Sequence, residues 1–215
     1  MDNHKGNIER AAEETPEQKR KKERQLEKQI ITVFVILALV FAGFLIAYNL
    51  FKPKPYFNFE GMTVYNARME GIKTLFYIIP ISGGGQRADI VLRHDPRTLG
   101  NISVSVNESL YGISQVWVTI PPEYSSDAVI AANDIGSFTS KIGLQTNFSL
   151  TNSSTGYAEI TCENATKETR VFLMDLGNET QVFEDKNCII IRGENYESLV
   201  KASDALVFNW LLKLK

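Results

Sequence analysis

Residues 30–50 read IITVFVILALVFAGFLIAYNL, a run of 21 residues without a charged side chain. At about 1.5 Å of rise per residue, a helix of this length spans about 30 Å, the thickness of the hydrocarbon core of a bilayer. Inside lipid every backbone amide needs a partner within its own segment, so the run predicts a helix. We interpret it as a transmembrane helix, with the lipid bilayer as its surroundings.

Two other interpretations of this run are weaker. A buried core helix would be shorter and less uniformly apolar in a chain of 215 residues. A cleaved signal peptide has an apolar core of about 7–15 residues that ends at a small-residue cleavage site. Here a longer core follows a hydrophilic segment, and the next residues, Asn49-Leu50-Phe51-Lys52-Pro53, do not resemble such a site. The sequence therefore favours an uncleaved anchor.

Basic residues close to the membrane predict the orientation of the anchor. Only Lys52 and Lys54 lie close after it, whereas six basic residues precede it: Lys19, Arg20, Lys21, Lys22, Arg24 and Lys28. The positive-inside rule then places the N-terminus in the cytoplasm and the C-terminal part outside the cell membrane. The same six residues can also attract anionic headgroups, although a topology signal alone explains them.

The flanking residues suggest where the segments begin and end. Thr15 can cap a helix and Pro16 suits its first position, so one helix is expected from Pro16 through the membrane. The expected segments are a disordered cytoplasmic tail (1–15), a cytoplasmic basic helix (16–29), the transmembrane helix (30–50), a proline-stiffened linker (51–55) and an extracytoplasmic domain (56–215).

Short alternating runs in the last segment predict β-strands. They lie at 73–81, 88–94, 101–106, 115–120, 144–150, 170–175, 181–183 and 188–192, and helical spacing is found at 126–142 and 196–214. Gly83–Gly85 lacks the Lys-Ser/Thr of a phosphate-binding loop, so it predicts a hairpin turn. Strands on both sides of a central helix indicate the α/β class, with α+β as the alternative. We expect a single mixed-sheet domain with two main helices.

Six N-x-S/T triplets lie on the predicted outer side, and such triplets accept N-glycans on secreted surfaces. Their asparagines are Asn101, Asn107, Asn147, Asn152, Asn164 and Asn178. Alternation in 144–150 turns Asn147 away from the apolar side chains of its strand. An uncommitted polar surface is the other interpretation for each of these sites.

Both cysteines, Cys162 and Cys188, also follow the anchor. An even number of cysteines outside the cytoplasm favours a disulfide bond, and two buried free thiols are the alternative. Closing a loop of about 27 residues would contribute about 3–4 kcal/mol to stability in the chain-entropy model.

Several classes of chemistry lack the necessary residues. The segment after the anchor has 15 basic and 18 acidic residues, which disfavours nucleic acid as a partner. With His4 and His94 as the only histidines, no metal site is expected, and no nucleotide-binding motif indicates a cofactor.

The densest polar cluster is Arg93-His94-Asp95-Pro96-Arg97, which makes His94 and Asp95 the candidate catalytic residues. The alternative is a strand-ending turn capped by Asp95. Asp204 and Glu197 are assigned to the solvated face of the last helix.

Four stretches carry a resemblance to known proteins. They are FNFEGM (57–62), IVLRHDPR (90–97), VWVTI (116–120) before a proline turn and a helix, and NCIIIRG (187–193) before a helix reading LVKASDALVFNWL. The part of the chain from residue 56 resembles an uncharacterised group of archaeal single-pass membrane proteins. The resemblance implies an extracytoplasmic α/β domain at the cell surface and transfers no active site. A eukaryotic type II glycoprotein would fit the topology equally well.

The sequence thus predicts a membrane-anchored extracytoplasmic interaction or assembly module, a subunit of a cell-envelope complex. Its expected partners are other envelope or membrane proteins, and a homo-oligomer is compatible with the sequence. An envelope hydrolase or transferase that uses the Arg93–Arg97 cluster is the first alternative. A small-ligand receptor is the second, although the polar cytoplasmic residues contain no recognisable output domain.

Overall fold

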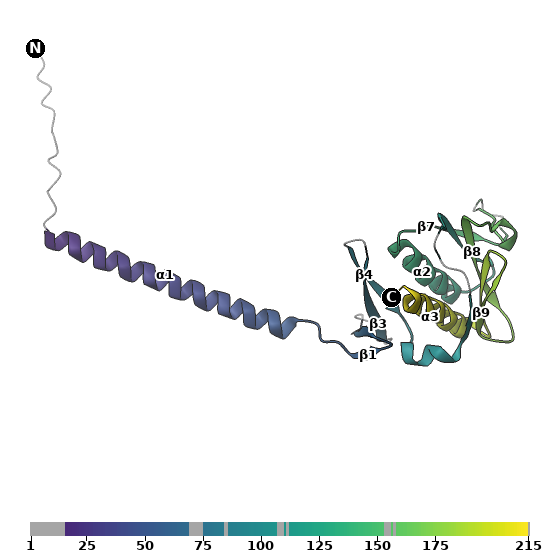
Figure 1. Ribbon diagram of the computed structural model, residues 1–215, viewed down its shortest axis with the longest axis horizontal. Coiled ribbons are helices and arrows are strands. Elements are labelled where there is room, and N and C mark those ends of the chain that lie inside the picture. The colour runs from purple at the N-terminus through teal and green to yellow at the C-terminus, as the bar shows by residue number, and fades with distance from the viewer. Residues whose placement is uncertain are drawn as a thin grey trace, which may run out of the picture. The chain divides into compact units, whose positions relative to one another are not determined.

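The computed structural model describes residues 16–68, 75–83, 86–106, 110, 112–152, 156 and 158–214 (Figure 1). The chain divides into two compact units, Met1–Pro53 and Lys54–Lys215. This boundary falls inside the predicted linker 51–55. The predicted tail 1–15 lies outside the described residues.

The first unit contains one long helix, α1 (Pro16–Phe51). It begins at Pro16 as the sequence predicts. Within it, Arg24–Phe51 is long and apolar enough to cross a bilayer, and none of that stretch is buried. Phe34 and Phe41, for example, are 68% and 64% exposed. An apolar helical surface of this size is stable in lipid and unstable in water.

The second unit starts with a four-stranded antiparallel meander. Its strands are β1 (Phe57–Phe59), β2 (Met62–Arg68), β3 (Leu75–Gly83) and β4 (Gln86–Leu92), in that order across the sheet. Glu60 and Gly61 adopt positive φ angles of 48° and 69° between β1 and β2, as a two-residue hairpin turn requires. The predicted hairpin corresponds to β3 and β4, whereas β1 and β2 were not predicted.

The remaining strands form a six-stranded mixed sheet. They are β5 (Ser103–Ser105), β6 (Gln115–Ile120), β7 (Gln145–Leu150), β8 (Thr169–Leu176), β9 (Gln181–Asp185) and β10 (Cys188–Gly193). The order across the sheet is β5-β9-β10-β8-β6-β7. Strands β6, β7, β8 and β10 run parallel, and β9 is antiparallel to β10. β7 is therefore one edge of this sheet.

Two helices, α2 (Ser126–Lys141) and α3 (Tyr196–Lys213), lie side by side between the two sheets (Figure 1). Trp210 of α3 stacks on Phe138 of α2 at 5.6 Å between ring centroids and meets Phe172 of β8 edge-on at 5.5 Å. On the other side, Phe208 of α3 stacks on Phe59 of β1 at 5.8 Å. The expected α/β fold with two main helices is confirmed, and its strands are divided between two sheets.

Cys162 and Cys188 form a disulfide bond, with 5.2 Å between their Cα atoms. Cys162 begins the short 3₁₀ helix η2 (Cys162–Asn164), and the buried Cys188 begins β10. The bond ties the segment that precedes β8 to the strand that leads into α3. A disulfide is typical of an oxidising compartment outside the cytoplasm.

Candidate functional site

The Arg93–Arg97 cluster lies where the chain leaves the four-stranded sheet. Arg93 and His94 directly follow β4, and Asp95 caps a second 3₁₀ helix, η1 (Pro96–Asn101). The middle of α2 contributes Asp134 to this region, and the middle of α3 contributes Asp204. The cluster therefore joins the hairpin sheet to both helices.

Asp204 is the buried centre of the site. Its Oδ2 atom accepts hydrogen bonds from the backbone N–H of Arg93 at 3.0 Å and of His94 at 2.8 Å. The Nδ1 atom of His94 lies 2.8 Å from the same oxygen. Asp204 is 0% exposed, and its Oδ1 atom has no partner among the described residues. Burial raises the pKa of this carboxyl group, and the hydrogen bond from His94 opposes the rise.

Arg93 forms a bidentate salt bridge with Asp134 of α2. Its Nε atom lies 2.6 Å from Oδ2 of Asp134, and its second guanidinium nitrogen donates to Oδ1 at 3.2 Å. The guanidinium also lies over the Phe76 ring, 5.5 Å from its centroid. Burial raises the pKa of Asp134 to about 6, although Arg93 acts in the opposite direction. The ion pair fixes the position of Arg93 relative to α2, while the cost of removing both charges from water limits its contribution to stability.

Asp95 has different partners. It accepts a hydrogen bond from the backbone N–H of Arg97 at 2.9 Å, as a helix cap does, and its carboxylate pairs with the Arg97 guanidinium. The hydrogen bond from Arg97 holds the pKa of Asp95 below its usual value. Arg97 also lies 4.3 Å above the Phe57 ring of β1. The predicted turn capped by Asp95 is therefore present.

The structure separates the two candidate catalytic residues, since His94 pairs with Asp204 and Asp95 pairs with Arg97. Sequence reasoning missed Asp134 and was wrong about Asp204, which is buried and does not belong to a solvated face. A signal was available for Asp204. Its apolar neighbours at spacings of three, four and seven residues share its face of α3, and all of them are buried: Val200, Val207, Phe208 and Leu211.

The pairing of His94 with Asp204 has a defined chemical capacity. A carboxylate on Nδ1 fixes the tautomer and the orientation of an imidazole and leaves Nε2 to exchange a proton. The His94 side chain is 25% exposed, and its Nε2 atom has no hydrogen-bond partner within the described part of the chain. In the same described residues, no group of three or more His, Cys, Asp or Glu side chains is arranged to hold a metal ion.

The glycosylation candidates differ in accessibility. The side chains of Asn101, Asn152, Asn164 and Asn178 are exposed, while Asn107 lies outside the described residues. Asn147, in β7, has a buried Nδ2 atom without a hydrogen-bond partner among the described residues. Its triplet partner Ser149 is also buried and bonds to Thr119 of β6. A glycan on Asn147 is therefore incompatible with the folded strand.

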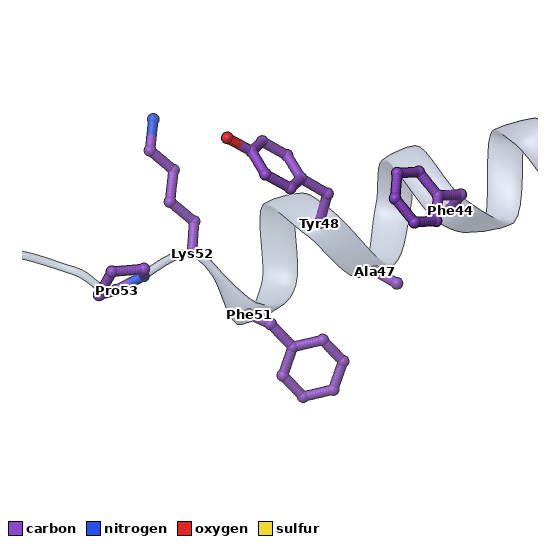
Figure 2. Close-up of a pocket in the computed structure, with 6 residues that line it drawn as sticks. All are labelled: Phe44, Ala47, Tyr48, Phe51, Lys52 and Pro53. Carbon is purple, nitrogen blue, oxygen red and sulfur yellow. The ribbon is translucent and has the colours of Figure 1, made fainter.

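The C-terminal end of α1 has the composition of a membrane interface. A hollow there is lined by Phe44, Ala47, Tyr48, Phe51, Lys52 and Pro53 (Figure 2). In the view of Figure 2, Tyr48 and Lys52 extend to one side of the helix and Phe51 extends to the other. Aromatic rings and lysine side chains with this arrangement are typical of the headgroup region.

No protein-family model matches the chain, and no curated protein or solved structure is significantly similar to it. The resemblance to an archaeal family therefore stays a prediction.

Proposed function

We propose that this protein is a membrane-anchored interaction or assembly module whose C-terminal domain, Lys54–Lys215, works outside the cytoplasm. One observation carries the proposal: the polar cluster Arg93–Arg97 is used to hold the domain together. Arg93 is bound to Asp134, His94 to Asp204 and Asp95 to Arg97, in each case at hydrogen-bonding distance.

The location is supported from both sides of the anchor. Six basic residues precede the apolar stretch, and the disulfide and the exposed N-x-S/T triplets follow it. Tyr48 and Lys52 mark the outer interface. The first strand, β1, begins at Phe57, so the tether between α1 and the folded domain is short. A short tether favours partners in the same membrane or in the cell wall.

The test is crosslinking in native membranes, followed by purification in mild detergent and mass spectrometry. We expect crosslinks from the exposed surface of Lys54–Lys215 to other envelope proteins. Isolation of the protein as a clean monomer, without crosslinks to any other protein, would overturn the proposal. The same digest reports the glycans and the Cys162–Cys188 bond.

An envelope hydrolase or transferase is the second candidate. It is favoured by the buried Asp204 carboxylate on Nδ1 of His94, which is the arrangement of a general base and its orienting group. On this view His94→Gln abolishes turnover of ester or phosphoester substrates, while Asp95→Asn leaves turnover unchanged. Equal activity of the wild type and His94→Gln across such substrates would remove this candidate.

A further inference from the structure

Strand β7 has an open edge. It pairs with β6 on one side, and on the other side the described residues that it meets form a short segment near its end. There Leu150 donates its N–H to Ala158 and accepts from the N–H of Ile160, whereas the N–H of Thr151 bonds toward β6. Backbone groups two residues apart point the same way in a strand. Thr146 and Phe148 therefore direct their N–H and C=O groups toward the open edge.

The open stretch has sharp limits. The N–H of Leu144 is already bound to the carbonyl of Thr139, and Leu150 is covered by residues 158–160. Among the described residues, the backbone groups of Thr146 and Phe148 on this side have no partner. β7 reads QTNFSL, so it lacks the charges and prolines that commonly protect sheet edges.

Phe148 of β7 and Val129 of α2 are both exposed apolar residues. Phe148 is 51% exposed and Val129 is 54% exposed. The Phe148 ring lies against Gly136 of α2, where an added Cβ would be 2.4 Å from the ring. Val129 precedes Gly136 by two helical turns, so it lies on the same side of α2. Phe148 therefore places an exposed apolar side chain next to the unpaired backbone of β7.

We propose that β7 is where two copies of this chain associate, by antiparallel pairing of β7 with β7 about a two-fold axis at Asn147. In this register Thr146 of each copy pairs with Phe148 of the other. Each pair exchanges two hydrogen bonds, so the four N–H and C=O groups of each open edge all find partners. The inference rests on the proposed role as an interaction module and names one of its partners.

A second copy fits better than an unrelated strand for two reasons. The two unpaired residues, Thr146 and Phe148, lie on either side of Asn147. A two-fold axis at Asn147 therefore gives each of them a partner in the second copy. Pairing it with itself brings no like charges together, because β7 carries none. A contact this short would be weak in dilute solution. Anchors that confine both copies to one membrane raise their effective concentration.

Asn147→Cys in the full-length protein tests the register. Directly opposed residues of a non-hydrogen-bonded antiparallel pair lie about 4.5 Å apart at Cα, within disulfide range. Cys162 and Cys188 are bonded to each other, so the added thiol is the free one. In reconstituted membranes under mild oxidation we expect a covalent dimer of Asn147→Cys. Gln145→Cys, two residues from the axis, should remain monomeric.

A charge at the edge provides the matched comparison. Phe148→Lys added to Asn147→Cys should lower the crosslinked fraction by roughly tenfold or more, because like charges then meet at the interface. Leu214→Lys, at another exposed apolar residue, should leave it unchanged. Retention of the Cys162–Cys188 bond and of tryptophan fluorescence checks folding. Wild-type copies with two different tags, reconstituted together and crosslinked through amines, test association without any substitution at β7.

The outcomes separate this inference from the proposed function. Equal crosslinking of Asn147→Cys and Gln145→Cys, or no association of the tagged wild-type copies, overturns the β7 dimer. Capture of a different protein by Asn147→Cys in native membranes also overturns it and assigns the edge to a foreign strand. If the dimer is absent but other envelope proteins are crosslinked elsewhere on the domain, the inference fails and the proposed function stands.

Discussion

The Nδ1 atom of His94 lies 2.8 Å from Oδ2 of Asp204, although 110 residues separate the two in the chain. The same oxygen accepts both backbone N–H groups of the Arg93–His94 turn. One buried carboxylate on α3 therefore fixes the direction in which the chain leaves β4. The contact links the four-stranded sheet to the helical layer and so helps to hold the three layers together.

Replacement of Asp204 should be strongly destabilising. Asp204→Ala leaves three donors around Oδ2 without their acceptor, and we expect it to lower the free energy of unfolding by about 3–5 kcal/mol. Asp204→Asn keeps one oxygen acceptor and should cost less. Glu197→Ala, at an exposed position on the same helix, should cost less than about 1 kcal/mol. Urea titration of the full-length protein in mild detergent, followed by tryptophan fluorescence, measures all three values. Equal losses for Asp204→Ala and Glu197→Ala would contradict the assigned role.

The stability of the domain should fall as the pH rises from about 4 to about 6. Burial raises the pKa of Asp134 to about 6 in the folded protein, against 3.8 for the free side chain. Between these values the folded state keeps a proton that the unfolded chain releases, so protonation favours folding. The pKa of Asp204 is raised as well and acts in the same direction. For Asp134 the difference corresponds to about 3 kcal/mol.

Asp134→Asn should therefore flatten the decline in the free energy of unfolding between pH 4 and pH 7.5. Asp127→Asn, at an exposed position on the same helix, should retain it. Urea titrations at several pH values give the free energy at each. A slope that is the same in Asp134→Asn and the wild type would show that Asp134 does not carry the effect.

Local patterns predicted most of the elements, because strand alternation and helical spacing are set by neighbours in sequence. β6, at 115–120, was predicted to the residue, and α2 and α3 were predicted to within one residue at each end. β1 was missed because a strand of three residues is too short to show alternation. β2 was missed because it is partly exposed and its sequence alternates weakly. The division into two sheets and the order across each depend on contacts between distant residues, which no local pattern contains.

The candidate site shows the same limit. The Arg93–Arg97 cluster was visible as a run of polar residues, and so was the cap formed by Asp95. The partners of Arg93 and His94 lie on helices 41 and 110 residues away in sequence. Asp204 was assigned to a solvated face, although its apolar neighbours at helical spacing are a signal of burial, and the identity of its donors required the fold.

The disulfide should contribute measurably to stability. Cys162 and Cys188 are 26 residues apart, and closing a loop of this length contributes about 3–4 kcal/mol in the chain-entropy model. We expect reduction of the wild type to lower the free energy of unfolding by this amount. The double variant Cys162→Ala/Cys188→Ala should show the same loss and no further response to reductant. A wild type whose urea midpoint is unaffected by complete reduction, verified by thiol labelling, would contradict the prediction.

Gly193 should be intolerant of any side chain. An added Cβ would lie 2.3 Å from the backbone nitrogen of Leu199 and 2.7 Å from the carbonyl oxygen of Asn195, where β10 leads into α3. Backbone atoms of a packed helix cannot move away cheaply, so Gly193→Ala should cost about 3 kcal/mol or more. Gly100→Ala is the matched control, because an added Cβ there meets nothing within 4 Å. Similar urea midpoints for the two variants would show that the start of α3 can shift.

Glycan mapping should distinguish the N-x-S/T triplets by accessibility. A glycan is attached through Nδ2 of asparagine, and that atom is buried in Asn147, whereas the side chains of Asn101, Asn164 and Asn178 are exposed. Mass spectrometry of the protein from its own membranes should find glycans at exposed sites and unmodified Asn147. Asn178→Gln, in the exposed turn after β8, should remove one glycan without changing the urea midpoint. Asn147→Gln should remove no glycan and should be destabilising, because the longer side chain does not fit the buried space that the Asn147 amide occupies. A glycan on Asn147 in folded protein would show that this face of β7 is open and would exclude the two-fold pairing at this residue.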